Sequence, residues 1–484
     1  MRSALLQKLL NKQKSVKYGD FITNEQWPEL HNNILTGQTK IDDILPPLIE
    51  RDKLINFAQY STTLEPNPSN LKILSQILPK LPETQLPVLL PNFRNLVLGY
   101  TQYQSQVIDL LVRSLFIIDT SAIVDVLISI VQAIPTIHSA VSSSLTKFFP
   151  QTNFPQDQQI RYLRACLTLC SVSSDIAVNT LGRIFQHLVA LDCELLLDPS
   201  NDGSVQVDDD VAQCLTPQLT YFLNYVSQTN STIFTLLLQL FDLYLIDLPH
   251  VVAVQFIYFF SSSFDHSTAE TFVGFLLAKI IDDSASLRTR SNATLYLESL
   301  VVHAEYIDDE FAAAIVDYVA NFANCYALHI KNEAPERLKM DIKIHNLYYF
   351  AVQCVTYITC WRWKGWSQSN IDPIQRWHLD DLLTNPLRAI DVIDKNTADM
   401  FKSLNIFQIN DESIVIERIS VWFPFDPCPL DEIAQIVANT YTQWSEVEGN
   451  NDIDALLDSE LSRLCESRLI SIDPIISTQN SQNI

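Results

Sequence analysis

The chain has 484 residues, with 32 Lys and Arg against 56 Asp and Glu, which gives a formal net charge of −24. Its 47% of hydrophobic residues suffice for a sizeable core, while the acidity argues against tight, independent binding to the phosphate backbone of a nucleic acid. Only eight glycines occur, and no two lie within five residues of each other. Dinucleotide-binding loops, phosphate-binding loops and nucleophile elbows need closely spaced glycines, so these sites are excluded and no cofactor is expected.

The first 17 residues are locally basic, with five cations: Arg2, Lys8, Lys12, Lys14 and Lys17. This pattern is typical of the solvated face of a first helix, and a contact with an acidic partner or a weak nuclear-import signal are the functional alternatives. Polar residues interrupt the short apolar run of this segment, so we expect no secretory signal.

Helical periodicity recurs along the chain. Residues 121–133 are apolar except for four polar residues three or four positions apart, which form one narrow stripe along a helix that is covered on most sides. Residues 310–324 have an apolar face opposite a polar one. Prolines, Pro217 and Pro249 among them, fall near the ends of the periodic runs.

We therefore predict an all-α fold, specifically a HEAT-repeat-like α-solenoid of about ten or eleven antiparallel helix pairs. The β-branched residues 251–260 would also fit buried strands, but the scarcity of turn glycines favours helices.

Four regions are predicted. Residues 1–191 form N-terminal helical repeats and residues 213–445 form C-terminal helical repeats. Between them, residues 192–212 carry seven acidic residues and no basic one, which indicates an exposed acidic loop. Residues 446–484 are expected to form an acidic terminal helix followed by a polar tail.

Neither metal binding nor membrane insertion is indicated. The nine cysteines have no C-x-x-C spacing and the histidines form no H-x-x-x-H pair, so we expect free thiols in a reducing compartment. The most apolar stretch, residues 233–260, is broken by Gln239, Asp242, Asp247 and Pro249. It predicts buried helices and not a membrane span.

Carboxylates cluster at residues 208–210, 282–283, 308–310 and 380–381. Such pairs could serve as a general acid and base or bind a cation, but at helix starts they complement the helix dipole, and we favour that structural interpretation. No local arrangement positions a nucleophile, so no catalytic residue and no enzyme activity are predicted.

An aromatic stretch at residues 357–366 contains Trp361, Trp363 and Trp366 together with Arg362 and Lys364. It could be a protein-binding hot spot or a platform on which nucleic-acid bases stack. We favour a helix end whose alternate aromatic rings enter the core.

Serines cluster at two places in the N-terminal half, and the members are Ser142, Ser143, Ser144, Ser171, Ser173 and Ser174. Most such residues are helix caps or loop residues. A phosphate there would add up to about two negative charges, enough to block docking onto an acidic or closely packed partner.

Five sequence motifs follow one another in the second half of the chain. They are VQFIYFFSSSF at 254–264, RSNATLYLESLVVHAEYI at 290–307, HNLYYFAVQCVTYITCWRWK at 345–364, NPLR at 385–388 and FPFDPC at 423–428. In order and spacing they resemble the RNA polymerase I-specific transcription initiation factor family of the TIF-IA type. The positions that carry the resemblance are Arg290, Tyr296, Tyr349, Gln353, Asn385, Pro386, Phe423, Pro424, Phe425, Asp426, Pro427 and Cys428.

The resemblance implies a non-catalytic, nuclear and nucleolar HEAT-repeat adaptor. Such a protein binds RNA polymerase I and couples it to the core promoter factor at ribosomal DNA. It also implies self-association of the free protein and regulation by phosphorylation of a serine patch near the polymerase contact. Ser142 to Ser144 and Ser171 to Ser174 are the candidates by location.

Two other classes of function are weighed against this one. A karyopherin-like transport carrier shares acidic helical repeats, and another HEAT-repeat scaffold would look similar. An enzyme built on an α-solenoid would need polar residues gathered from distant helices, and the sequence gives no positive sign of one.

Overall fold

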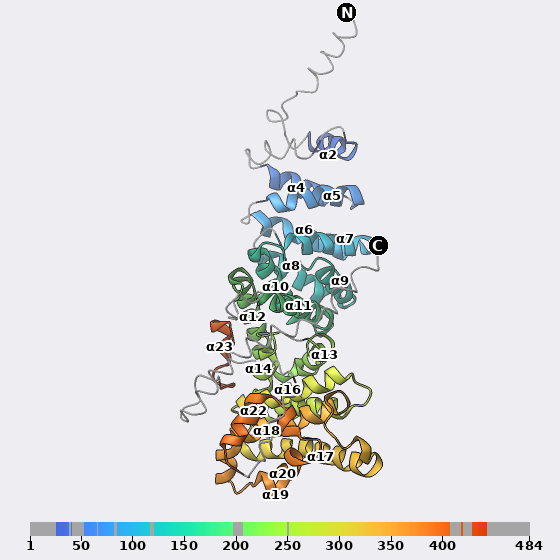
Figure 1. Ribbon diagram of the computed structural model, residues 1–484. Helices are drawn as coiled ribbons and strands as arrows, with labels where there is room; N and C mark the ends of the chain where they lie inside the picture. The colour runs from blue at the N-terminus through green and yellow to red at the C-terminus, as the bar shows by residue number, and fades with distance from the viewer. Residues whose placement is uncertain are drawn as a thin grey trace, which may run out of the picture. The chain divides into compact units, whose positions relative to one another are not determined.

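The computed structural model describes residues 26–37, 40, 53–64, 66–81, 85–116, 121–196, 207–248, 251–406, 418–419 and 428–442. These residues are mainly helical, and two isolated β-bridges are the extended pairings among them (Figure 1). The chain divides into two compact units, residues 1–184 and 185–484. The prediction of an all-α fold is confirmed.

The first unit stacks its helices in two layers. Its helices are α2 (Trp27–Leu35), α4 (Leu54–Thr63), α5 (Pro68–Ile77), α6 (Leu86–Gly99), α7 (Gln104–Ser114), α8 (Ser121–Ala133), α9 (His138–Lys147) and α10 (Gln156–Cys170). In one layer α4 packs on α6, α6 on α8 and α8 on α10, and in the other α5 packs on α7 and α7 on α9. This alternation is the packing of an α-solenoid, while the HEAT type of its repeats stays a prediction.

The second unit follows α11 (Ser174–Leu195), which crosses the division between the units. Its larger helices are α12 (Asp209–Thr229), α13 (Phe234–Tyr244), α15 (His266–Ile281), α16 (Leu287–His303), α17 (Asp309–Glu333) and α18 (Ile342–Gln368). Its shorter helices are α14 (Phe256–Ser262), α19 (Pro373–Trp377), α20 (Leu379–Thr384), α21 (Ala389–Val392), α22 (Lys395–Ser403) and α23 (Asp431–Val437).

The core of this unit is built around α16 and α18. Residues 291–301 of α16 and 347–360 of α18 are buried without a break. Such helices must be covered on every side, and α16 lies against α15 and α18, while α18 also lies against α17 and α22.

The carboxylates at 208–210, 308–310 and 380–381 lie at helix starts, as predicted, whereas Asp282 and Asp283 follow the C-terminal end of α15, so the prediction is wrong for that pair. Asp308 accepts a hydrogen bond from the backbone N–H of Phe311 at 2.7 Å, and Asp208 accepts from Asp210 and Val211 at 3.0 and 3.1 Å. A carboxylate at this position satisfies N–H groups that have no partner within the helix. Other cap residues that bind N–H groups in this way are Asn67, Asp265, Ser286, Asp341, Asp372 and Asp394.

The predicted helices are confirmed. Residues 121–133 form α8 with the polar stripe outward, and residues 310–324 lie within the longer α17. The β-branched segment before residue 260 is a turn followed by α14, so helix and not strand is the outcome.

Two expectations differ from the structure. Pro217 lies inside α12 and not at a helix end. The helix continues because the buried Leu215, Leu219 and Phe222 hold both sides of it in the core, which offsets the hydrogen bond that proline cannot donate.

The second difference concerns the predicted acidic loop at residues 192–212. Helix α11 runs to Leu195 and α12 begins at Asp209, so both helices extend into this segment, and Asp192 is buried. The exposed character of residues 197–206 lies outside the described residues, as do the basic first 17 residues, Pro249 and residues 446–484. The division into four regions stays a prediction.

By length and composition, α17 could cross a membrane, and so could α8 and α9 if the bent pair were one span. Helix α17 nevertheless carries Asp317, whose carboxylate binds Arg376 of α19 at 2.7 and 2.8 Å and the indole of Trp377 at 2.7 Å. A bonded charge in the middle of a helix that packs on α18 is typical of a folded core. The absence of membrane binding stays a prediction.

Candidate protein-interaction surface

The serines of the first cluster lie on α9 but point in different directions. Ser142 and Ser144 are buried, and Ser143 is exposed. The hydroxyl of Ser142 lies 3.5 Å from that of Thr180 on α11, and Ser144 donates a 2.8 Å hydrogen bond to Asp109 on α7. Only Ser143 of these three is open to a kinase without local unfolding.

The second cluster lies at the turn between α10 and α11. Ser171 and Ser174 are exposed, while Ser173 is half-buried and lies 3.0 Å from Nδ1 of His138, the first residue of α9. The contacts to Thr180 and His138 bring the two serine clusters together within the first unit. We call the exposed members Ser143, Ser171 and Ser174 the serine surface.

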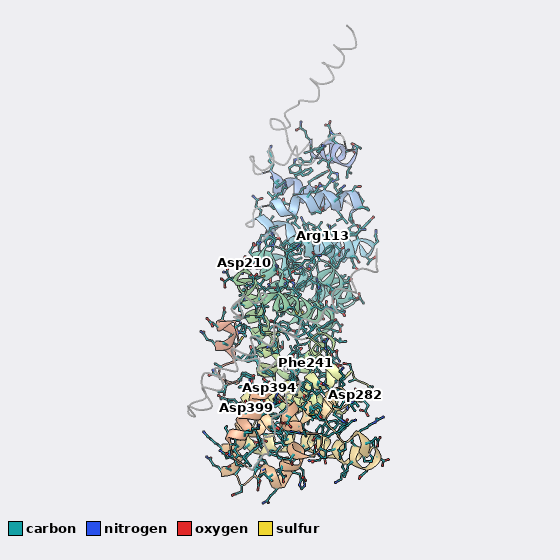
Figure 2. The ribbon with its side chains drawn as sticks, in the orientation of Figure 1. Arg113, Asp210, Phe241, Asp282, Asp394 and Asp399 are labelled. Atoms are coloured by element: carbon teal, nitrogen blue, oxygen red, sulfur yellow. The ribbon has the colours of Figure 1, made fainter. Side chains whose placement is uncertain are left out.

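Cations stacked on aromatic rings lie on the same helices. The guanidinium of Arg113 is 4.4 Å from the centre of the Phe148 ring, and the ammonium of Lys147 is 4.7 Å from it. Arg113 and Lys147 are exposed, and Lys147 also forms a 2.8 Å ion pair with Asp109 (Figure 2 labels Arg113). These contacts hold two cations in fixed positions on α7 and α9, with Lys147 one helical turn from Ser143.

Charge is divided unevenly between the units. Residues 1–184 contain 16 Lys and Arg against 14 Asp and Glu, a net charge of +2. Residues 185–484 contain 16 against 42, a net charge of −26. The net negative charge of the chain therefore lies entirely in the second unit, and the serine surface lies on the first unit, whose net charge is slightly positive.

Arg290 and Tyr296, two of the positions that carry the family resemblance, have structural roles on α16. The Arg290 guanidinium donates to the carbonyl of Ile280 at 2.9 Å and pairs with Asp283 at 2.8 Å, which fixes the end of α15. The buried ring of Tyr296 meets Phe241 edge to face at 4.8 Å, and burial raises the pKa of its phenol well above 10.0.

The NPLR turn is held by tyrosines of α18. Tyr349 donates to the carbonyl of Leu387 at 2.9 Å, and the Asn385 amide donates to the hydroxyl of Tyr348 at 2.8 Å. Pro386 is exposed beside them. These residues fix the turn before α21.

Gln353 is the centre of a buried polar network. Its amide nitrogen lies 3.1 Å from a carboxylate oxygen of Glu298 on α16 and 2.8 Å from the hydroxyl of Thr397 on α22, and its oxygen accepts from the backbone N–H of Asp394 at 3.0 Å. Burial raises the pKa of Asp394 above its usual range. The network joins three helices of the core.

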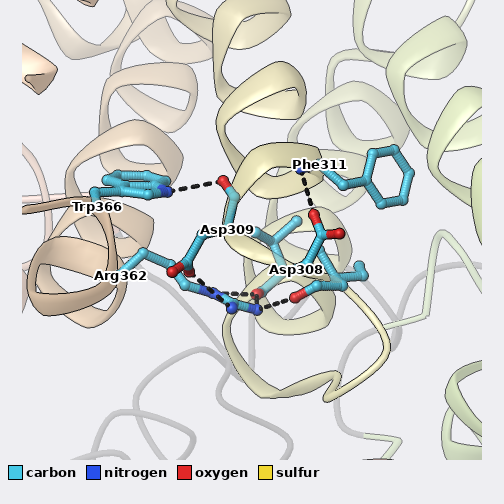
Figure 3. A network of polar contacts seen from close by, with 7 residues as sticks. Asp308, Asp309, Phe311, Arg362 and Trp366 are labelled. Carbon is cyan, nitrogen blue, oxygen red and sulfur yellow. Dashed lines mark hydrogen bonds and ion pairs between the residues drawn. The ribbon is translucent and has the colours of Figure 1, made fainter. Parts of the chain in front are cut away.

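The aromatic stretch at the end of α18 binds the start of α17 (Figure 3). Arg362 donates to the carbonyls of Val301 and Ile307 at 2.6 and 2.9 Å and pairs with Asp309, while the buried Trp366 donates to the carbonyl of Asp309 at 3.0 Å. The interpretation as a helix end packed into the core is confirmed for Trp366.

Of the FPFDPC motif, Cys428 is described and buried, and Phe423 to Pro427 lie outside the described residues. The segment that follows returns to α16. The hydroxyl of Tyr441 lies 2.8 Å from that of Ser299, and its ring stacks on His303 at 5.0 Å. We call these contacts between the C-terminal segment and α16 the anchor. The sequence does not predict the anchor, because the residues that meet in it are more than 130 positions apart.

His303 makes the anchor sensitive to acid. Its Nδ1 lies 2.9 Å from the carbonyl of Thr442, and burial lowers the pKa of the imidazole to about 4. The unfolded state binds a proton at the usual pKa of 6.5, so stability is complete above about pH 6.5 and falls as the pH drops toward 4. We expect a loss of about 2 kcal/mol at about pH 5 from this group.

Urea unfolding of wild type and His303→Gln at about pH 7.5 and pH 5 measures this contribution. Glutamine keeps a donor for Thr442 but does not titrate, so the variant should lose about 2 kcal/mol less on acidification. Equal losses in the two proteins would contradict the assignment.

No group of three or more metal-binding side chains is present in the part of the chain that the structure describes, and its eight cysteines are free thiols. The fold defines an α-solenoid protein. Its buried polar networks hold helices together, and its candidate interaction residues, the serine surface, lie on exposed helix faces. Residues 93–220 and 209–401, more than half of the chain, match the family described as "RNA polymerase I specific transcription initiation factor RRN3". The chain belongs to this family.

Individual proteins agree. The chain is 22% identical over 409 residues to the RNA polymerase I-specific transcription initiation factor rrn3 of Schizosaccharomyces pombe, covering 68% of this chain and 67% of that protein. It is 22% identical over 239 residues to RRN3 of Mus musculus, covering 43% of this chain and 36% of that protein. The chain thus spans about a third of the mouse relative.

A solved structure shows the same fold. The crystal structure of RNA polymerase I transcription initiation factor Rrn3 superposes with a TM-score of 0.66 at 16% identity, over 88% of this chain and all of that chain.

Proposed function

We propose that this protein is a non-catalytic adaptor that binds RNA polymerase I and recruits it to the core promoter factor at ribosomal DNA promoters. It works in the nucleus and nucleolus, needs no cofactor, and self-associates when free of the polymerase. The single observation that carries the proposal is the family match across residues 93–401.

The structure supports the adaptor role in two ways. The second unit, with a net charge of −26, disfavours independent capture of promoter DNA. The polar networks around Tyr349, Gln353 and Arg362 are bound within the helical packing, which leaves the exposed helix faces as the means of action. A protein of this kind acts by presenting surfaces to other proteins.

Affinity purification of the tagged full chain from its own cells, followed by mass spectrometry, tests the proposal. We expect subunits of RNA polymerase I and of the core promoter factor in the eluate. Normal expression without polymerase I subunits would contradict it. Release of the bound proteins by the GTP-bound form of Ran would instead support the karyopherin-like alternative.

The serine surface should regulate polymerase binding. Ser143→Asp places an anion one helical turn from Lys147, and Ser174→Asp places one at the exposed start of α11. For each variant we expect about fivefold weaker polymerase binding, on the order of 1 kcal/mol, with an unchanged melting temperature. Quantitative pull-down and thermal unfolding measure the two effects.

Ser142→Asp is the matched comparison from the same turn of α9. Its carboxylate would replace a buried hydroxyl, so this variant should lower the melting temperature, which Ser143→Asp should not. Full polymerase binding by both surface variants would remove the serine surface from the proposal.

A further inference from the structure

A groove lies between α15 and α17 in the second unit, with a volume of about 420 Å³. One wall comes from α17 and the other from α15, and most of the lining is apolar. Among the lining residues are Glu270, Gly274, Ala278, Ile281, Ala314 and Tyr318.

The walls of the groove expose large apolar side chains to solvent. Tyr318 is 70% exposed and Ile281 is 63% exposed, although both lie on helices whose other faces pack against α16 and α18. The floor is open, because a Cβ atom built on Gly274 meets no other atom within 4 Å. A concave apolar face of this kind indicates a binding site for another molecule.

The shape of the groove selects the kind of occupant. Two neighbouring helices with small residues between larger walls leave a channel along their length, and Gly274, Ala278 and Ala314 lie in it. An amphipathic helix fits such a channel by laying one apolar face into it. The lining of α15 runs from Glu270 to Ile281, about 18 Å along the helix axis, which is about three turns of a helix.

The charge around the groove indicates which charge the polar face of that occupant carries. From residue 308 to residue 322 there are four carboxylates and no Lys or Arg. From residue 265 to residue 283 there are four carboxylates and one cation, Lys279, which is held by Asp242 at 2.6 Å. Three of these carboxylates are already paired with arginines from outside the two windows: Asp309 with Arg362, Asp317 with Arg376 and Asp283 with Arg290. Glu270, which lines the groove 3.3 Å from His266, and Glu310, which is exposed beside Phe311, are left to face basic side chains of the occupant.

The same charge disfavours two other occupants. A second copy of this unit would bring another net charge of −26 against the groove. An anionic membrane surface would be repelled by the acidic rim for the same reason.

We propose that the groove between α15 and α17 is a docking site for an amphipathic helix with a basic polar face, supplied by a partner protein. This inference does not depend on the polymerase I assignment, because it rests on the shape and charge of one face.

The test uses the full chain and a designed, fluorescein-labelled peptide of 18 residues. Its leucines recur at helical spacing along one face, and lysine fills the other positions. Fluorescence anisotropy should show binding that Gly274→Phe, which fills the channel, and Tyr318→Ala, which removes a wall, each weaken at least about tenfold in Kd. Both positions are open to solvent, so circular dichroism and melting temperature should stay those of wild type.

Matched variants and peptides separate specific docking from attraction to an acidic protein. Leu328→Ala removes an exposed apolar side chain from α17 outside the groove, and Gly99→Phe makes the same exchange at an open helical glycine of α6; both should bind as wild type does. A peptide of the same composition in non-helical order, and one with glutamate for lysine, should bind at least about tenfold more weakly.

Five results would overturn the proposal. These are equal binding of the ordered and reordered peptides, no binding of the ordered peptide, and wild-type affinity in both groove variants. The fourth is a groove variant that changes the sedimentation of the protein alone, which would identify a second copy as the occupant. Binding to phosphatidylserine vesicles that Gly274→Phe abolishes would identify a membrane surface instead.

Discussion

Replacing Asp192 with alanine is expected to destabilise the second unit by about 3 to 5 kcal/mol. The buried carboxylate accepts three backbone hydrogen bonds, from Val252 and Ala253 at 3.0 Å and from Val254 at 2.7 Å. These N–H groups belong to the turn before α14, where no helical carbonyl is available to them. Alanine would leave three buried donors without this acceptor, and urea unfolding measures the cost.

Two further variants define the cause. Asp192→Asn keeps one acceptor oxygen of the same shape, so its loss should be intermediate, about 2 kcal/mol. Glu194→Ala removes an exposed carboxylate two residues along the same helix and should change stability by less than about 0.5 kcal/mol. A wild-type stability for Asp192→Ala would show that water or another group satisfies the turn.

The helices were predictable from sequence because their signals are local. The stripe of polar residues on α8 and the apolar face of α17 recur within a few turns, and the acidic caps lie beside the helices they begin. The place of Pro217 inside a helix was not predictable. The tendency of proline to end a helix is a local signal, whereas the buried side chains that keep α12 continuous around it pack against other helices. Neighbouring residues in the sequence do not show that packing.

The role of Asp192 could not be predicted for the same reason. In the sequence it stands at the edge of an acidic, apparently exposed segment, and its three partners lie about 60 residues further on. The serine clusters show a similar limit. In α9 the side chains are too small and too alike for a periodic pattern to separate the buried Ser142 and Ser144 from the exposed Ser143.

The family resemblance located residues that maintain the core. Arg290, Tyr349 and Gln353 bind other parts of the second unit, and none of these three lines the groove between α15 and α17. Motifs of this kind identify a fold through its polar core contacts, while the surfaces that choose partners follow from exposure and charge. This explains why sequence reasoning reached the family without finding the groove.

Gln353→Ala is expected to cost about 3 to 5 kcal/mol of stability. The substitution removes an amide that binds Glu298, Thr397 and the backbone of Asp394, and it leaves a cavity between α16, α18 and α22. Since the carboxylate of Glu298 is buried, loss of this donor is costlier than loss of an apolar contact of equal size. Gln368→Ala, at the exposed end of the same helix, should change stability by less than about 0.5 kcal/mol. Urea unfolding of both variants tests this expectation. Equal stabilities of Gln353→Ala and Gln368→Ala would mean that α22 is held by its apolar contacts alone.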